Sequence, residues 1–294
     1  MTERYRKATA YALLAALLYS LNSPVSKILL RTVPSAMMGG LLYLGAGVGL
    51  LITGIIQKTF KKGNQESPLT KSDLPYIIGM VLLDIAAPMC LMYGLTKTTA
   101  ANASLLNNFE IAATSLIAFY AFKESITKRL CSAIGLVTLS SLILSFEDIS
   151  SLSFSIGSLF VLLACICWGF ENNCTKKLSV KNPLQIVVIK GFFSGFFSVL
   201  IALALGQRIT NMFYIVCALL LGFVSYGLSI FFYVYAQRYL GAAKTSTYYA
   251  VAPFAGTALS LVIFKEIPSI TFIIALSIMI IGTYFASTEK RKNA

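Results

Sequence analysis

Four ionisable side chains stand inside strongly hydrophobic stretches of the sequence. Asp84 and Glu110 fall near the middle of their stretches, and Glu171 and Lys190 lie within about two helical turns of one end. A charge at the centre of a membrane helix costs about 2.5–3.5 kcal/mol on insertion scales, so each of these groups is a candidate for a binding or coupling site. Two other interpretations stay open, which are snorkelling or mutual pairing of Glu171 and Lys190, and a purely structural ion pair for Asp84 and Glu110.

Uncharged polar and aromatic residues accompany these charges at the same depth. Helical spacing places Asn107 within reach of Glu110, and Asn172 directly follows Glu171. Lipid offers amides no hydrogen-bond partner, so these side chains must face other helices or water. A hydrated cavity explains them better than helix-to-helix contacts alone, and aromatic rings could stack there on flat or cationic solutes. The full set of candidate substrate-binding or coupling residues is Asp84, Glu110, Glu171, Lys190, Asn22, Asn107, Asn172, Tyr19, Trp168 and Tyr248.

The composition determines which elements position these residues. The chain has 294 residues, of which 57% are hydrophobic and 12% charged, whereas a soluble domain is about 45–50% apolar and about 25% charged. A water-soluble globular protein is therefore excluded. Because a membrane helix needs about 20 mostly apolar residues, the apolar runs predict an all-α integral membrane protein with ten transmembrane helices. Their ranges are 8–30, 34–56, 74–95, 100–121, 129–146, 155–175, 183–205, 211–236, 242–263 and 269–287. Pro24, Pro88 and Pro253 fall in or near these ranges and favour kinks or hinges.

The positive charge indicates an orientation rather than a nucleic-acid partner. The net charge is +13, but the basic residues occupy short polar gaps between the apolar runs. Eighteen of the 24 Lys and Arg residues fall on one side if the gaps alternate, which predicts cytoplasmic N- and C-termini and an even number of helices. The exceptions are Lys27, Arg31, Lys97, Arg208 and Lys265 on the other side and Lys190 within a helix.

Several chemistries lack their usual residues. The sequence has no histidine, and its six cysteines lie in or at the ends of apolar runs, so neither a disulfide framework nor a zinc site is expected. No nucleophile with a neighbouring base is visible, and no Gly-x-x-x-x-Gly-Lys-Ser/Thr loop for ATP is present. We therefore expect no enzyme activity, no metal and no cofactor.

The chain also repeats itself. Tyr19 to Lys27 aligns with Trp168 to Lys176 at an offset of 149, and Thr99 to Ser104 aligns with Gly241 to Ser246 at an offset of 142. The second offset also places Phe122-Lys-Glu124 on Phe264-Lys-Glu266. The sequence thus predicts two five-helix halves, 1–148 and 149–294. Because five is odd, the halves enter the membrane from opposite sides, which is the usual architecture of alternating-access carriers.

With these features the chain resembles the EamA-type family of the drug/metabolite transporter superfamily. The resemblance rests on the 5+5 repeat, the run Asn22-Ser-Pro-Val-Ser-Lys27, and the Lys-Glu pairs that close the fourth and ninth helices, where the family usually has Gly-Glu. It implies a central cavity among helices one to four and six to nine, with helices five and ten peripheral. It also implies transport of small metabolites or drugs.

The functional expectation is a secondary active transporter of the plasma or inner membrane. It would move a small polar solute, such as an amino acid or amine, by alternating access, with the lipid bilayer as its surroundings and protons as a candidate coupling ion. Three buried acids against one buried lysine favour a cationic or zwitterionic substrate, or proton coupling through Glu110 or Asp84. A channel or a membrane receptor for a small solute is the alternative.

Overall fold

The computed structural model describes residues 3–60, 69–123, 126–148, 153–178, 181–240, 245 and 248–287. Apart from one small β-hairpin, the regular structure is helical, and seven of the described helical stretches are long and apolar enough to cross a membrane. The first half contains α1 (Glu3–Ser20), α2 (Asn22–Leu29), α3 (Ser35–Phe60), η1 (Lys71–Asp73), α4 (Leu74–Lys97), α5 (Ala100–Leu106), α6 (Phe109–Phe122) and α7 (Lys128–Ser145).

The second half follows the hairpin. The hairpin consists of β1 (Phe146–Asp148) paired antiparallel with β2 (Ser153–Phe154). The helices after it are α8 (Ile156–Leu178), α9 (Pro183–Ala204), α10 (Met212–Gly222), the π-helical turn η2 (Phe223–Leu228), α11 (Ser229–Leu240), α13 (Ala252–Phe264) and α14 (Ile270–Ser287).

Several predicted helices are interrupted rather than continuous. The first divides into α1 and α2 at Leu21, because Pro24 has no N–H to donate to the Ser20 carbonyl. The fourth divides into α5 and α6 at Asn107 and Asn108, whose carbonyls accept tight three-residue hydrogen bonds of 3.1 and 3.0 Å. The eighth contains η2. In the predicted ninth helix, α13 begins at Ala252, and residues 242–244 and 246–247 before it lie outside the described residues.

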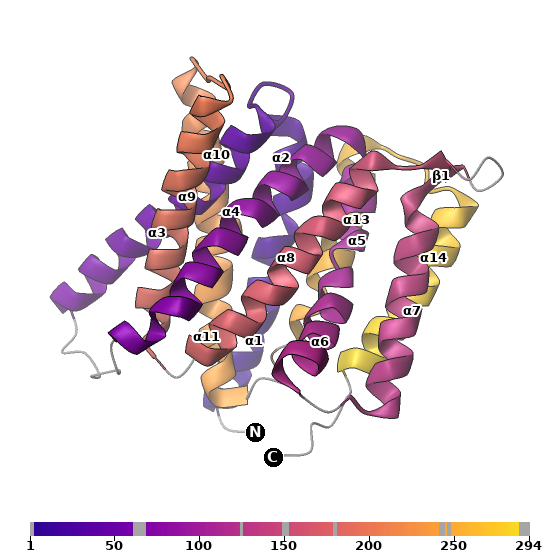
Figure 1. Ribbon diagram of the computed structural model, residues 1–294, viewed down its shortest axis with the longest axis horizontal. Helices are drawn as coiled ribbons and strands as arrows, with labels where there is room; N and C mark the ends of the chain where they lie inside the picture. The colour runs from indigo at the N-terminus through magenta and orange to yellow at the C-terminus, as the bar shows by residue number, and fades with distance from the viewer. Residues whose placement is uncertain are drawn as a thin grey trace.

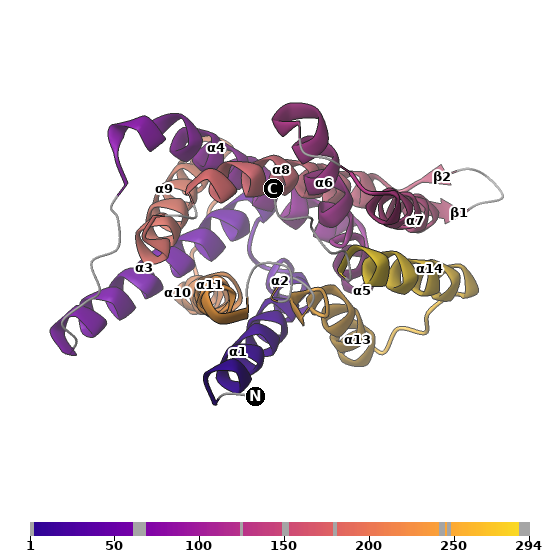
Figure 2. The same ribbon diagram turned by 90° about the horizontal axis from the view of Figure 1, so that it is seen from below.

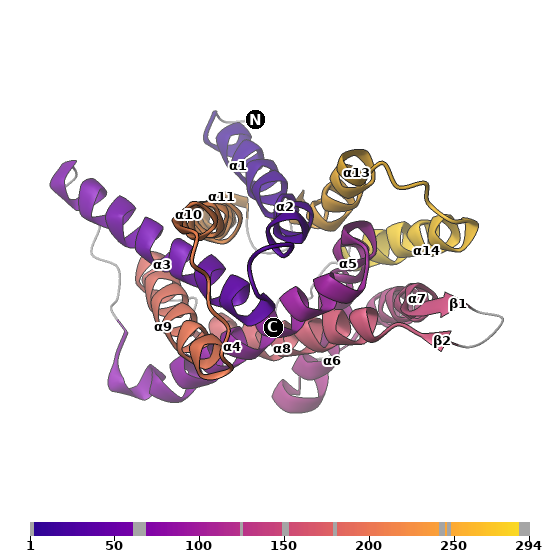
Figure 3. The same cartoon turned by 90° about the horizontal axis from the view of Figure 1, so that it is seen from above.

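The two halves run from opposite ends of the molecule. In Figure 1, α1 begins and α14 ends at the lower end, whereas the hairpin that leads into α8 lies at the upper end. The most extensive packing joins the halves, through the pairs α3 with α9, α4 with α8, α1 with α11, and α7 with α14. Views along the bundle show α7 and α14 side by side at one edge, away from the middle (Figures 2 and 3). This is the peripheral position that the family resemblance implied for the fifth and tenth helices.

Glycines bring the central helices into close contact. A Cβ on Gly191 of α9 would lie 2.5 Å from the backbone nitrogen of Gly47 in α3. A Cβ on Gly45 would lie 2.0 Å from the Leu219 carbonyl oxygen in α10. Real Cβ atoms do not come this close to backbone atoms, so only glycine permits α3 to approach both neighbours.

Lysine rather than glycine caps α6 and α13. Lys123 and Lys265 follow these helices in the left-handed conformation, with φ of 54° and 52°. The offset of 142 relates the two positions, so the repeat keeps this conformation in both halves. Left-handed backbone is easiest for glycine, which accounts for the Gly-Glu ending usual in the resembling family. Of the two Lys-Glu pairs, Glu124 lies outside the described residues.

A lysine joins two helices at the end opposite the chain termini. Lys27 in α2 donates to the carbonyl oxygen of Leu95, and to that of Thr98 at 2.7 Å, so it ties α2 to the end of α4. Glu266, in the turn after α13, interacts electrostatically with Lys27. Burial raises the pKa of the Glu266 carboxyl, and the attraction of Lys27 opposes that rise.

Candidate functional site

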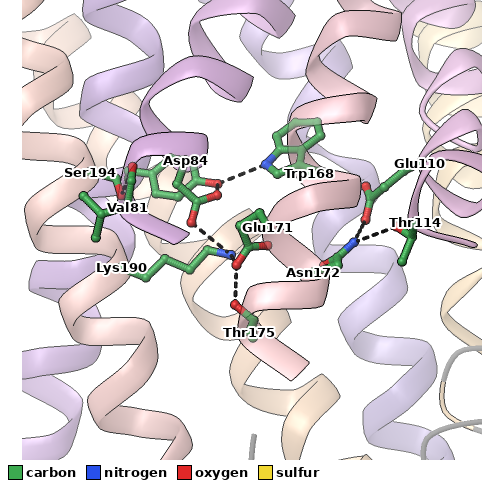
Figure 4. A network of polar contacts seen from close by, with 11 residues as sticks. Val81, Asp84, Glu110, Thr114, Trp168, Glu171, Asn172, Thr175, Lys190 and Ser194 are labelled. Carbon is green, nitrogen blue, oxygen red and sulfur yellow. Dashed lines mark hydrogen bonds and ion pairs between the residues drawn. The ribbon is translucent and has the colours of Figure 1, made fainter. Parts of the chain in front are cut away.

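Three of the predicted site residues form one ionic cluster in the middle of the bundle. The ammonium nitrogen of Lys190 in α9 lies 3.2 Å from Oδ2 of Asp84 in α4 and 2.9 Å from Oε1 of Glu171 in α8 (Figure 4). Asp84 is fully buried and Glu171 is 2% exposed. Burying such charges is costly unless they are paired and hydrogen-bonded. Lys190 is therefore the shared counter-ion of both acids.

Hydroxyl groups complete the ionic cluster. Tyr43 of α3 donates its hydroxyl hydrogen to Oδ1 of Asp84 at 2.7 Å and accepts a hydrogen bond of 3.2 Å from the indole nitrogen of Trp168. Thr175 donates to Glu171 one turn further along α8. Sequence reasoning did not single out Tyr43 or Thr175, because neither differs in spacing from the many other Tyr and Thr residues of the apolar stretches.

Glu110 occupies a different position. It begins α6 directly after the helix break, and the side-chain nitrogen of Asn172 donates to its Oε1 at 2.6 Å and contacts the Thr114 hydroxyl at 3.3 Å. Figure 4 shows this group on one side of α8 and Lys190 with Asp84 on the other. Among the residues that the structure describes, no cation pairs with Glu110. Its side chain also keeps part of its surface exposed, unlike Asp84.

A neutral pair stands where the repeat would place a second ionic cluster. The side-chain nitrogen of Asn22 in α2 donates to the Tyr226 hydroxyl in η2 at 3.1 Å. The offset of 149 relates Asn22 to Glu171, and the offset of 142 relates Tyr226 to Asp84. The Tyr226 ring also packs on Tyr43, with centroids 5.1 Å apart. The two halves thus share a scaffold, but only one of these equivalent positions is charged.

The remaining predicted site residues divide between two places. The Tyr19 ring lies 5.8 Å from both the Tyr226 and the Tyr249 ring, and Tyr19 and Asn107 line a small cavity beside the helix breaks. Tyr248 lies elsewhere, because it packs against the hydrophobic cluster of Ala8, Ala12, Ala236 and Leu240 near the start of α1. The structure therefore brings nine of the ten candidates to the middle of the bundle and leaves Tyr248 apart.

In the part of the chain that the structure describes, no three or more Asp, Glu, Cys or His side chains lie together as the ligands of a metal ion. The chemistry of this site is that of carboxylates, one amine, amides, hydroxyls and aromatic rings.

Comparison of the sequence with models of known families identifies a family with this fold. The model of the EamA-like transporter family matches residues 6–146 and again residues 155–288. The chain belongs to the EamA-like transporter family. Each match covers one five-helix half, so this EamA-like protein is an all-helical membrane protein with ten membrane helices in two repeats.

Individual relatives agree with this assignment. An uncharacterized transporter of Methanothermobacter thermautotrophicus is 25% identical over 284 residues, which are 92% of this chain and 83% of the relative. A protein known from a crystal structure superposes with a TM-score of 0.66 and 15% identity over 95% of both chains, which supports the fold alone. The EamA-like chain is thus a multi-pass membrane transporter for a small solute, of a family typical of the cell membrane, and not an enzyme.

Proposed function

We propose that this EamA-like transporter is a secondary carrier for a small organic solute that bears a positive charge, either a cation or a zwitterion such as an amino acid or amine. The halves 1–148 and 149–294 would rock about the polar interior, so that the site opens to each side of the cell membrane in turn. Both termini would face the cytoplasm, as the distribution of Lys and Arg predicts.

The observation that carries this proposal is the position of Glu110. Lys190 is shared between Asp84 and Glu171, so it is not available to Glu110. Asn172 supplies a hydrogen bond to Glu110 but no positive charge. A partly exposed carboxylate at membrane depth, held by an amide and without a cation, is suited to receive the ammonium group of a substrate.

The same contacts choose between the two acids considered for proton coupling. Asp84 is paired with Lys190 and accepts the Tyr43 hydroxyl, so its charge is already balanced. Glu110 can exchange its proton for a substrate cation without disturbing that cluster. We therefore propose Glu110 as the group at which protons and substrate compete.

Counterflow in proteoliposomes tests the proposal. Proteoliposomes that contain a carrier and are loaded with unlabelled amine or amino acid should transiently accumulate the labelled compound. Proteoliposomes that contain a channel should not. Glu110→Gln should abolish this exchange and its pH dependence while membrane insertion is unchanged. The matched control is Glu147→Gln in β1, which should behave as the wild type. Equal counterflow by Glu110→Gln and the wild type would remove Glu110 from the mechanism.

A further inference from the structure

A small cavity lies where α1 ends and α5 ends. It has a volume of about 10 Å³, and the side chains and backbone around it come from Ser20, Ser23, Ser104, Asn107, Pro253 and Gly256. A space of this size admits one particle of about the size of a water molecule, so no organic solute fits. The cavity is therefore too small to be the substrate site that we propose at Glu110.

Ser104 is the unexplained polar group of this cavity. Its side chain is 3% exposed, and its hydroxyl oxygen has no hydrogen-bond partner. A buried hydroxyl without a partner costs about 1–3 kcal/mol. Its place in the wall of a cavity of single-particle size indicates that a ligand satisfies it.

The backbone adds further oxygen ligands. Pro24 cannot donate to the Ser20 carbonyl, and Ser20 is the last residue of α1, where the helix presents its negative end. Asn107 follows the last residue of α5, at another helix end, and lines the cavity. Its amide oxygen accepts a long contact of 4.0 Å from the Cys165 thiol and has a second lone pair for another ligand. Gly256 of α13 leaves the space open, because a Cβ there would lie 3.1 Å from both the Ser104 hydroxyl and the Ser20 carbonyl oxygen.

The net negative charge of the bundle interior favours a cation over a water molecule in the cavity. The bundle interior holds the carboxylates of Asp84, Glu171 and Glu110 against the single ammonium of Lys190. Glu110 lies one turn after Asn107, and its backbone N–H donates to the Asn107 carbonyl at 3.1 Å. Pro253, at the start of α13, brings no N–H that would compete. Hydroxyl and carbonyl oxygens at interrupted helices are the ligands by which transporters hold Na⁺.

From these contacts we infer that the cavity is a Na⁺ site, formed by the Ser104 hydroxyl, the Ser20 carbonyl and the Asn107 amide oxygen. Building on the proposed carrier function, Na⁺ is the ion that holds the interrupted helices α1 and α5 against α13. Its binding would couple the sodium gradient to the rocking of the halves.

Thermal unfolding of the purified full-length protein in NaCl, with KCl and choline chloride at equal ionic strength, tests this inference. Na⁺ should raise the melting temperature in a saturable manner, because it binds the folded state, and choline should not. Ser104→Ala should weaken the apparent Na⁺ affinity by about tenfold or more, the loss typical of removing a group that supports a metal site. Gly256→Ala should have the same effect by filling the cavity.

Two matched variants serve as controls. Ser198→Ala removes another buried hydroxyl without a partner, in α9 and outside this cavity, and Gly135→Ala adds a methyl group where no atom lies within 4 Å. Both should keep the full Na⁺ response. Equal stabilisation by Na⁺ and choline, or an unchanged response in Ser104→Ala, would overturn the site and show that the cavity holds water. Because this measurement needs no transport, a Na⁺ response without counterflow would contradict only the proposed carrier function.

Discussion

The Lys190 ammonium of α9 lies 2.9 Å from the Glu171 carboxylate of α8. Both side chains come from uninterrupted helices, whereas Glu110 follows the break between α5 and α6. The paired charges thus lie in continuous helices, whereas the acid without a cation directly follows an interruption between helices.

Lys190→Met should destabilise the protein strongly. It leaves the carboxylates of Asp84 and Glu171 buried without a cation, and breaking a buried ion pair from one side costs about 3–5 kcal/mol. Chemical unfolding in detergent measures the loss. The triple variant with Asp84→Asn and Glu171→Gln should recover most of it. A single variant as stable as the wild type would show that Lys190 is not the counter-ion of these acids.

Tyr43→Phe isolates the hydroxyl that joins Asp84 to Trp168. Removal of this hydroxyl takes away one hydrogen-bond partner of Asp84 Oδ1 and the partner of the Trp168 indole N–H. We therefore expect a loss of about 1–3 kcal/mol in the free energy of unfolding. Tyr120→Phe is the control, because Tyr120 is 76% exposed and should tolerate the change. Equal stability of the two variants would contradict the hydrogen-bonded chain.

Lys265→Gly should stabilise the protein. Lys265 has φ of 52°, and left-handed backbone costs a residue with a side chain about 1–2 kcal/mol. Lys265→Ala removes the same charge but keeps the Cβ, so it should give no gain. Thermal unfolding of both variants separates the backbone effect from the charge. A gain in the alanine variant as large as in the glycine variant would argue against strain.

Gly45→Ala should disrupt the contact between α3 and α10. The new Cβ would lie 2.0 Å from the Leu219 carbonyl oxygen, and overpacking of this kind costs about 1–3 kcal/mol or more. Fluorescence-detected size-exclusion chromatography after heating reports the loss of folded protein. Gly135→Ala in α7, which meets no neighbour, should be at least as stable as the wild type because alanine favours helix.

The sequence predicted the ten helices and their repeat because long apolar runs leave few alternatives in a membrane. It placed Asp84 near the middle of its helix and Glu171 and Lys190 within about two turns of a helix end, and pairing of Glu171 with Lys190 was one of the interpretations left open. That Lys190 also pairs with Asp84 depends on how α4, α8 and α9 are rotated against one another, which a single sequence does not specify. Pro24 predicted a kink or hinge in the first helix, where the structure has a break, whereas the break at Asn107 has no proline and was not predicted.

The same limit applies to residues near the site that the candidate set did not contain. Tyr43 and Ser104 are ordinary residues of apolar helices, and their roles come from neighbours far away in the chain. Tyr248 shows the opposite case, since an aromatic ring at helical depth predicted a site residue, but the ring packs beside α1. The repeat offsets were the best available signal, because they relate Tyr226 to Asp84 before any coordinates are considered.

The neutral pair Asn22 and Tyr226 and its charged counterpart Glu171 and Asp84 make the duplicated scaffold unequal. If the halves exchange their conformations during a cycle, the exchanged state does not recover the same set of electrostatic contacts. The outward-facing and inward-facing forms therefore differ in free energy. The transitions between them in the two directions then cross barriers of different height. Vesicles that contain the protein in both orientations should accordingly show two kinetic phases of uptake rather than one.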